Sequence, residues 1–361
     1  MENNMSAALI FSNVKVNNGS YFETFTEEAL IIITTITAIL LLLAIPANIL
    51  VLLAYLKTSS ALKKPANYLL VNLTISELLL ALVVIPLQLL VHIKPSLISD
   101  GGALCMLVGI LTYPFYTAVI ITMICVSVDR YYAIRAPLSY KFKISGNRIA
   151  YMITYTWFHA GAFVFGFGFS LGIGFNPQMG VCGILWDNNM TVSGVGAITH
   201  IVLPFFLLLG LNINLVVSLK RQNRIAVNSL DYRQNQIWKA RQAQERRITF
   251  LVFWIISTYL LCWLPYLVTR GLWVMLSQPT SALTSTIATI SLQLSVLIDP
   301  SLNLVFRKDL RATIERLIRR RRNESITIPT GGLNLGFTRV SEYTRHNTRI
   351  FVRPKSENVD D

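Results

Sequence analysis

The sequence predicts an all-α membrane protein, a bundle of seven transmembrane helices followed by a short amphipathic helix. Hydrophobic residues make up 53% of its 361 residues and charged residues only 14%, a composition too apolar for a soluble globular domain. Seven runs of the chain are long and apolar enough to cross a bilayer, which takes about 20 residues. Almost all basic residues lie between or after these runs, on one side of the predicted bundle.

The seven predicted spans follow one another without sequence repeats. They are residues 29–56, 66–92, 102–128, 149–175, 191–219, 248–269 and 282–306. The last is rich in Ser, Thr and Gln, so we expect it to be buried in protein rather than exposed to lipid. Several spans contain a proline, which removes one helix hydrogen bond and favours a kink; these are Pro46, Pro86, Pro204, Pro265 and Pro300.

The distribution of charge predicts the orientation of the bundle. Of the 32 lysines and arginines, all but Lys15, Lys94 and Arg270 lie in four segments on one side: 57–64, 130–148, 220–247 and 307–361. The positive-inside rule therefore predicts a multi-pass plasma-membrane protein with its N-terminus outside and its C-terminus in the cytosol. The net charge of +14 is assigned to the membrane surface, so we expect no nucleic-acid partner.

The chain divides into four predicted parts. They are an extracellular arm (1–28), the seven-helix domain (29–306), a basic amphipathic cytosolic helix (307–322) and a disordered cytosolic tail (323–361). The arm carries no recognisable cleavable signal peptide. The four arginines from Arg319 to Arg322 are expected to bind anionic lipid, at ~1 kcal/mol for each basic residue near the membrane surface.

Two kinds of modification are predicted on the extracellular side. Sequons for glycosylation stand at Asn4, Asn18 and Asn189. Cys105 begins the third span at its outer end and Cys182 lies in the loop after the fourth, so both face an oxidising compartment. We therefore expect them to form a disulfide. Cys125 and Cys262 lie in the middle of spans and are expected to pack as small hydrophobes.

An acid, a guanidinium and a phenol stand together where a charge-free run ends. The run extends from Gly102 to Val128, and Asp129-Arg130-Tyr131 follows it. A charge in hydrocarbon costs several kcal/mol unless it is paired or hydrated, so such a triplet at a membrane edge is a functional hypothesis. The alternative is that Asp129 and Arg130 are interfacial anchors that reach toward lipid headgroups.

Landmarks on the successive spans resemble those of the rhodopsin-like (class A) G-protein-coupled receptors over about residues 30–320. They are Asn48, Asn72-Leu73, the interval from Cys105 to Arg130, Trp157, Pro204, Cys262-Trp263-Leu264-Pro265 and Asp299-Pro300. Three shorter strings are similar to one small branch of vertebrate orphan receptors: Pro137 to Tyr140, Tyr155 to His159 and Pro265 to Arg270.

The resemblance implies a receptor rather than an enzyme, whose partner is a heterotrimeric G protein and whose helices rearrange to admit the end of its α subunit. The residues implied in this switch are Asp129, Arg130, Tyr131, Glu245 and Asn303. Arg130 is expected to pair at rest with Asp129 and with Glu245 on the sixth helix, which clamps two helices together. The lever and hinges are expected at Trp263, Pro265, Pro204 and Pro300.

The chain departs from the family pattern in its core. Glu77 stands where the family has Asp, and Asp299 where the seventh helix more often has Asn. Two carboxylates at short range cannot both ionise cheaply, so we expect either a shared proton or a sodium ion held with Asn48 and Ser295. Asn303 and Asn212 replace two tyrosines that meet through water in active relatives, and these amides are shorter.

The family's ligand pocket maps onto a mixed set of side chains. These are Thr112, Tyr113, Tyr116, His200, Tyr266, Arg270, Thr289 and Gln293. Thr112 replaces the aspartate that pairs amines, which argues against a simple amine ligand. Gln293 replaces the lysine that holds retinal, which argues against a retinal cofactor. Arg270 is expected either to meet an anionic extracellular ligand or to be a hydrated rim residue.

Two other functions fit part of this pattern. A ligandless receptor would act constitutively or as part of a heteromer. An ion-coupled transporter would carry protons or sodium at Glu77 and Asp299, but transporters usually show internal repeats and broken helices near the midplane, and neither is found in the sequence.

Overall fold

The computed structural model describes eight stretches of the chain, and the following description is confined to them. They are residues 27–58, 66–94, 102–136, 139–176, 181–186, 188–225, 232–276 and 282–326. The sequons at Asn4 and Asn18 and nearly all of the predicted tail lie outside these stretches.

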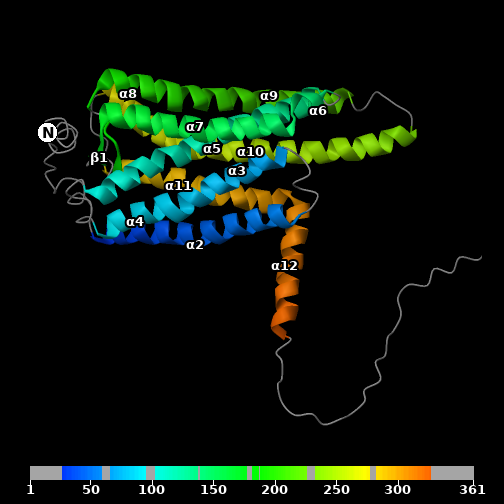
Figure 1. The fold of residues 1–361 in the computed structure, drawn as a ribbon, viewed down its shortest axis with the longest axis horizontal. Helices are drawn as coiled ribbons and strands as arrows, with labels where there is room; N and C mark the ends of the chain where they lie inside the picture. Colours follow the sequence, from blue (N-terminus) through cyan, green and yellow to red (C-terminus); the bar gives the residue numbers. More distant parts are fainter. Residues whose placement is uncertain are drawn as a thin grey trace, which may run out of the picture. The chain divides into compact units, whose positions relative to one another are not determined.

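Seven helical spans run side by side in one bundle (Figure 1). In order they are α2 (Glu27–Lys57); α3 (Ala66–Leu79) with η2 (Leu80–Val84) and α4 (Ile85–Ile93); α5 (Ala103–Arg135); α7 (Gly146–Leu171); α8 (Met190–Ala197) with η4 (Ile198–Val202) and α9 (Leu203–Ile225); α10 (Tyr232–Leu276); and α11 (Ala282–Phe306). A short α6 (Tyr140–Lys143) follows the third span, and α12 (Lys308–Ile326) follows the seventh.

Several helices end at other residues than the predicted runs, and three of these differences matter for the fold. The fourth span ends at Leu171 rather than at residue 175, because Gly172 adopts a φ of 82° and the chain continues as strand β1 (Ile173–Asn176). The sixth helix begins at Tyr232, well before residue 248, since a helix can continue past the membrane with a polar sequence. Helix α12 extends to Ile326, so residues 323–326 are helical rather than disordered.

Two of the expected proline disturbances take the form of π-helical segments. Segment η2 ends two residues before Pro86, and η4 ends two residues before Pro204. A proline ring clashes with the carbonyl four residues earlier and donates no hydrogen bond. A π turn, with its wider i→i+5 spacing, gives that carbonyl room, so the helix continues through the proline.

A two-stranded antiparallel hairpin lies at the end of the bundle opposite α6 (Figure 1). Strand β1 pairs with β2 (Val181–Ile184), with Phe175 opposite Cys182. Gly109 of α5 lies directly beneath it, where a Cβ atom would collide with the Ile173 side chain and approach the backbone of Gly183. A larger residue at position 109 would therefore push the hairpin away from the bundle.

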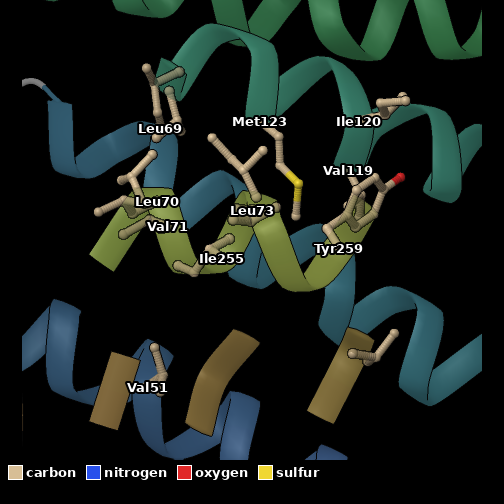
Figure 2. Packing of buried hydrophobic residues seen from close by; sticks show 14 of the residues in the cluster. Val51, Leu69, Leu70, Val71, Leu73, Val119, Ile120, Met123, Ile255 and Tyr259 are labelled. Carbon is tan, nitrogen blue, oxygen red and sulfur yellow. The ribbon is translucent and has the colours of Figure 1, made fainter. Parts of the chain in front are cut away.

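The core is a continuous layer of buried aliphatic and aromatic side chains between the spans (Figure 2). Two side-chain hydrogen bonds of Asn72 link three helices across this core. Asn72 of α3 donates to the Thr122 hydroxyl of α5 at 2.8 Å and accepts from the Trp157 indole of α7 at 2.9 Å. One asparagine thereby fixes the spacing of three helices, since its amide bonds would be left unpaired if any of them moved apart.

The outer surface of the bundle is apolar. Among the described residues, six helical spans have the length and hydropathy to cross a membrane. The fourth, α7, falls short on hydropathy because it is rich in Gly, Tyr, Trp and His rather than in aliphatic residues. Its outward side chains are nevertheless large and apolar, with Phe158 at 73% and Phe169 at 72% exposed. An aromatic outer face of this kind suits lipid as well as an aliphatic one does.

Candidate functional site

A buried arginine joins the third and sixth spans at the α6 end of the bundle. The Arg130 guanidinium donates through Nε and one Nη to a single oxygen of Asp129, at 2.8 and 2.6 Å. Its other Nη donates to Glu245 Oε2 of α10 at 3.0 Å. The side chains of Arg130 and Asp129 are only 4% and 1% exposed, and that of Glu245 is 27% exposed. Both predicted ion pairs are present.

Tyr140 of α6 completes this cluster and was not among the predicted switch residues. Its hydroxyl donates to the free oxygen of Asp129 at 2.7 Å, and Arg130 donates to it at 3.4 Å. Burial, and secondly the Asp129 carboxylate, raise the pKa of Tyr140 above its usual range, so the hydroxyl stays protonated. Tyr131 lies outside the cluster, against Tyr132 and beneath the Arg135 guanidinium.

A second buried arginine lies where α11 ends and α12 begins. One Nη of Arg307 donates to Asn67 of α3 at 3.1 Å and to the Tyr55 hydroxyl of α2 at 3.3 Å. Its Nε and other Nη meet the two oxygens of Asp309, at 3.2 and 2.6 Å. The bonded Arg307 lowers the pKa of Asp309 despite the opposing effect of partial burial. This arrangement fixes the start of α12 to the first two spans.

Asn303 joins this second cluster rather than the first. The Tyr55 hydroxyl donates to its side-chain oxygen at 3.1 Å, and its amide donates to the Asp299 carbonyl. Asn212 bonds instead to Ser257 of α10 at 2.9 Å. The two amides that replace the family's tyrosines are therefore engaged separately in this structure. A phenol is present beside Asn303, but it comes from the first helix.

The two core carboxyl groups do meet. Glu77 and Asp299 are 3% and 1% exposed, and their side chains are close enough to hydrogen-bond when one carries a proton. As carboxylates they only accept, so one oxygen of Glu77 and both of Asp299 have no donor. Asn48 bonds to the Val296 carbonyl at 2.9 Å and Ser295 to that of Leu292 at 2.7 Å. The Asn48 side-chain oxygen is also without a donor.

A narrow cavity of about 70 Å³ lies between the spans below the hairpin. Six of the eight predicted pocket residues line it: Thr112, Tyr113, Tyr116, His200, Tyr266 and Thr289. Gln293 lies in contact with a lining residue, since it donates to Gln88 at 3.0 Å. The side chain of Arg270 lies outside the described part of the chain. Gln88 and Phe163 also line the cavity and were not predicted from the sequence.

Aromatic rings close the cavity toward the hairpin. The Trp186 indole donates to the Tyr113 hydroxyl at 2.9 Å, and both rings pack on Phe163. His200 stacks on Phe163 with ring centroids 4.4 Å apart and on His159 at 5.0 Å. These rings leave the cavity little volume.

Two residues of the cavity lining, Tyr116 and Trp263, have polar atoms without partners. Trp263 packs edge-on against Tyr116 and Tyr266, at 6.1 and 5.9 Å between ring centroids. Both the Trp263 Nε1–H and the Tyr116 hydroxyl are buried without a hydrogen-bond partner. Because a buried unpaired donor costs about 1–3 kcal/mol, this part of the lining favours a molecule that brings an acceptor.

The predicted disulfide is present. It joins Cys105 at the start of α5 to Cys182 in β2, with the two Cα atoms 5.2 Å apart. Cys125 and Cys262 are free, as expected. The bond holds the hairpin over the cavity, because β2 cannot leave the end of α5 while it is intact.

A comparison with known families decides what kind of protein carries these features. Residues 47–303 match the family described as 7 transmembrane receptor (rhodopsin family). The chain belongs to that family. The family consists of receptors rather than enzymes, as the sequence predicted.

Relatives of this rhodopsin-family receptor are distant. It is 34% identical to an alpha-2 adrenergic receptor of Carassius auratus over 37% of this chain and 30% of the other, and 25% identical to the histamine H2 receptor of Rattus norvegicus over 66% of each. The chain thus spans about a third and about two thirds of these relatives. The crystal structure of squid rhodopsin superposes with a TM-score of 0.72 at 20% identity, covering 85% of this chain and 94% of that chain.

Proposed function

We propose that the protein is a G-protein-coupled receptor that promotes nucleotide exchange on a heterotrimeric G protein when α10 moves away from α5. The observation that carries this proposal is the ion pair between Arg130 and Glu245. It joins two spans through a guanidinium that is only 4% exposed, so its opening would uncover a buried charge. A buried charge that can be uncovered at one end of a helix bundle suits a two-state switch.

The ligand that drives this switch is proposed to be uncharged and to carry a hydrogen-bond acceptor. Trp263 and Tyr116, whose donors have no partner, belong to the cavity lining together with aromatic, aliphatic, threonine and glutamine side chains. Adrenergic and histamine receptors are among the relatives by sequence, but Thr112 stands where amine receptors carry an aspartate. Among the residues that the structure describes, no carboxylate that would pair an amine lines the cavity. Similarity to the orphan-receptor branch stays a prediction.

Glu77 and Asp299 are proposed to hold either a sodium ion or a shared proton, with different contents at rest and in the active state. Their carboxylate oxygens, together with the side-chain oxygen of Asn48, lack donors. A cation would satisfy all of these acceptors, whereas a proton would satisfy the carboxyl pair alone. Both alternatives remove the repulsion between two buried charges.

The placement in the cell follows from the basic residues. We propose that the Arg130 end of the bundle faces the cytosol and the hairpin faces the outside of the plasma membrane, with Asn189 available for glycosylation. The exposed asparagine caps α8, where its side chain accepts from the Val192 amide. The Arg319 to Arg322 run is proposed to lie on anionic lipid.

A ligandless receptor is the second candidate, and the small cavity favours it. A volume of about 70 Å³ is well below the roughly 300–1,000 Å³ of usual ligand pockets. In this case the aromatic rings around Phe163 would take the place of a ligand. The two candidates differ in basal activity. A ligandless receptor would have high basal activity, which requires the Arg130–Glu245 ion pair to open spontaneously, whereas a ligand-driven receptor would not.

The test is nucleotide exchange by purified G proteins of each α class with the purified receptor. Arg130→Ala should abolish receptor-dependent exchange while the protein stays folded. Arg130→Lys is the matched control, since it keeps the charge and loses the two-pronged contact. Exchange that is unaffected by Arg130→Ala in every class would refute the proposal.

A further inference from the structure

Helix α11 lacks one of its own hydrogen bonds, and a side chain of another helix supplies the missing donor. Pro300 has no backbone N–H, so it cannot donate to the Val296 carbonyl four residues earlier. The buried Asn48 amide of α2 donates to that carbonyl instead, at 2.9 Å. The first span thereby replaces the bond that the proline removes from the seventh.

A second contact between the same two helices lies beyond the proline. The Tyr55 hydroxyl of α2 donates to the side-chain oxygen of Asn303 at 3.1 Å. Each partner stands seven residues further along its helix than in the first contact. Seven residues make about two helical turns, so the two contacts lie on one face of each helix. Together they bracket Pro300 and keep α2 and α11 in register.

Arg307 sets the direction of the bond from Tyr55 to Asn303. Its guanidinium donates to the Tyr55 oxygen at 3.3 Å, and its guanidinium carbon lies 5.1 Å from the centre of the phenol ring. Because an arginine side chain only donates, the single proton of the phenol is left for Asn303. The Asn303 amide in turn donates to the Asp299 carbonyl at 3.1 Å. These residues form one directed chain of hydrogen bonds, in which each bond strengthens the next.

This chain gives a physical reason for the asparagine at position 303, where the resemblance to the receptor family implies a tyrosine. An amide offers an acceptor to Tyr55 and a donor to the Asp299 carbonyl at once, whereas a phenol has a single proton and a longer side chain. The substitution therefore puts an amide with two fixed partners where relatives have a phenol that acts in the active state.

The start of α12 belongs to the same assembly. Thr58, which follows α2, and Thr313 of α12 are both buried, with their hydroxyl oxygens 2.9 Å apart. The Arg307 amide donates to the Asn303 carbonyl at 3.0 Å, and the Arg311 amide donates to the Arg307 carbonyl at 3.1 Å. Backbone bonds thus continue from α11 into α12, and side chains join both helices to α2.

We infer that Tyr55 is a positioning residue of the receptor, which together with Asn48 locks α11 across Pro300 and keeps α2, α11 and α12 one rigid unit while α10 moves. Pro300 was expected to act as a hinge, and the two contacts brace it instead. A G protein that enters when α10 moves would then meet an α11 that is already in place. This last step rests on the proposed function, whereas the lock itself does not.

Hydrogen–deuterium exchange of the purified receptor tests the lock without a G protein. In Tyr55→Phe the backbone amides of residues 301–306 should exchange about fivefold faster, because one buried hydrogen bond is lost. Residues 283–295 should keep their rate, whereas a general loss of stability would speed exchange in every span. The matched control is Tyr259→Phe, which removes a buried hydroxyl that has no hydrogen-bond partner and should change neither segment.

Two further measurements identify the partner and the consequence. Asn303→Ala should speed exchange in residues 301–306 as Tyr55→Phe does, and the double variant should exchange no faster than Asn303→Ala alone, because both changes remove the same bond. Tyr55→Phe should also raise the G-protein concentration for half-maximal nucleotide exchange by about fivefold, since a smaller fraction of receptors holds α11 in place.

Three outcomes would overturn the inference. One is unchanged deuterium exchange of residues 301–306 in Tyr55→Phe, and another is equal acceleration in Tyr259→Phe. The third is a loss of protection in residues 301–306 when nucleotide-free G protein binds, because α11 would then move together with α10. If the lock is found but nucleotide exchange does not respond to Arg130→Ala, the proposed function fails and the lock stands.

Discussion

The two ends of the bundle are held together by different kinds of contact. At the hairpin end, the Cys105–Cys182 disulfide joins β2 to α5, and the Tyr113 ring of α5 packs on Phe163 of α7 and on Trp186, which follows β2. At the other end, Arg130 joins α5 to α10 through a salt bridge, and Arg307 joins α12 to the first two spans through hydrogen bonds. A covalent bond fixes a distance, whereas an ion pair can open and close with a few kcal/mol. This difference indicates that the hairpin end receives the signal and that the Arg130 end moves.

Arg130 and Arg307 also differ in whether their contacts can open. Both are buried, but the partner of Arg130 on another span is charged and partly exposed, and the partners of Arg307 on other spans are neutral and buried. Water can replace a partly exposed carboxylate when helices separate, while a buried amide and phenol would lose their donor. Arg130 is suited to a reversible contact and Arg307 to a permanent one.

Removing the Cys105–Cys182 disulfide at the hairpin end should have the largest effect. Removing a native disulfide typically costs about 2–5 kcal/mol, so Cys105→Ala and Cys182→Ala should reduce surface expression to a similar degree. The double variant should be no worse than either single one, which cell-surface labelling would measure. Additive losses would show that the two cysteines act separately. Cys125→Ala is the control, because that cysteine is free.

Removing the contacts of Arg307 should have the second largest effect. This effect should be on stability rather than on signalling. Arg307→Met should lower the free energy of unfolding by roughly 3 kcal/mol, since a hydrogen bond from a charged group contributes about 1.5–3 kcal/mol. Asp309→Asn should cost under about 1 kcal/mol, because that side chain is 44% exposed and its ion pair is therefore screened by water. Thermal unfolding of the purified receptor measures both. Equal losses would mean that Arg307 is held by its local carboxylate alone.

Breaking the Arg130–Glu245 ion pair should change the rate of nucleotide exchange with little loss of stability. Glu245→Ala should raise basal nucleotide exchange by about five- to thirtyfold, because roughly 1–2 kcal/mol of resting-state stabilisation is removed. Glu245→Gln keeps the size of the side chain and should act in the same direction. An unchanged basal rate in a well-expressed variant would show that this pair does not set the resting population.

The smallest effect is expected between the two ends, at the core carboxyl pair. If Glu77 and Asp299 hold sodium at rest, raising sodium at constant ionic strength should lower basal exchange, and Glu77→Gln should remove that dependence. If they share a proton, exchange should instead vary with pH, and Asp299→Asn should remove the variation. Insensitivity to both ions would reduce the pair to buried polar packing.

Much of this organisation could be predicted from residue order alone. Apolar run lengths located the spans, and the resemblance to the receptor family implied Glu245 of the sixth helix as the partner of Arg130. These predictions succeeded because charges inside a membrane protein are few and must pair. The end of α7 was misplaced because Ile173 to Phe175 are as apolar as the span before them, and only the positive φ of Gly172 separates the two.

Contacts between side chains distant in the chain could not be predicted. Tyr140 meets Asp129 because α6 places it there, and no spacing rule specifies that turn. Arg307 reads as one of many basic residues in α12 until its partners Tyr55 and Asn67 are seen. The resemblance implied Asn303 among the switch residues around Arg130, yet it bonds to Tyr55. Such pairings depend on how helices rotate about their axes, which hydrophobic periodicity fixes only coarsely.

The most direct test measures distances at both ends in one receptor. With Cys125 and Cys262 changed to Ser, spin labels would be placed at Arg135 and Arg247 for the Arg130 end, and in a second sample at Ala103 and Met190 for the hairpin end. Pulsed electron resonance would compare each pair with and without Glu245→Ala and in complex with nucleotide-free G protein. We expect a longer Arg135 to Arg247 distance and an unchanged distance at the hairpin end. Unchanged distances at the Arg130 end, or equal changes at both ends, would contradict this expectation.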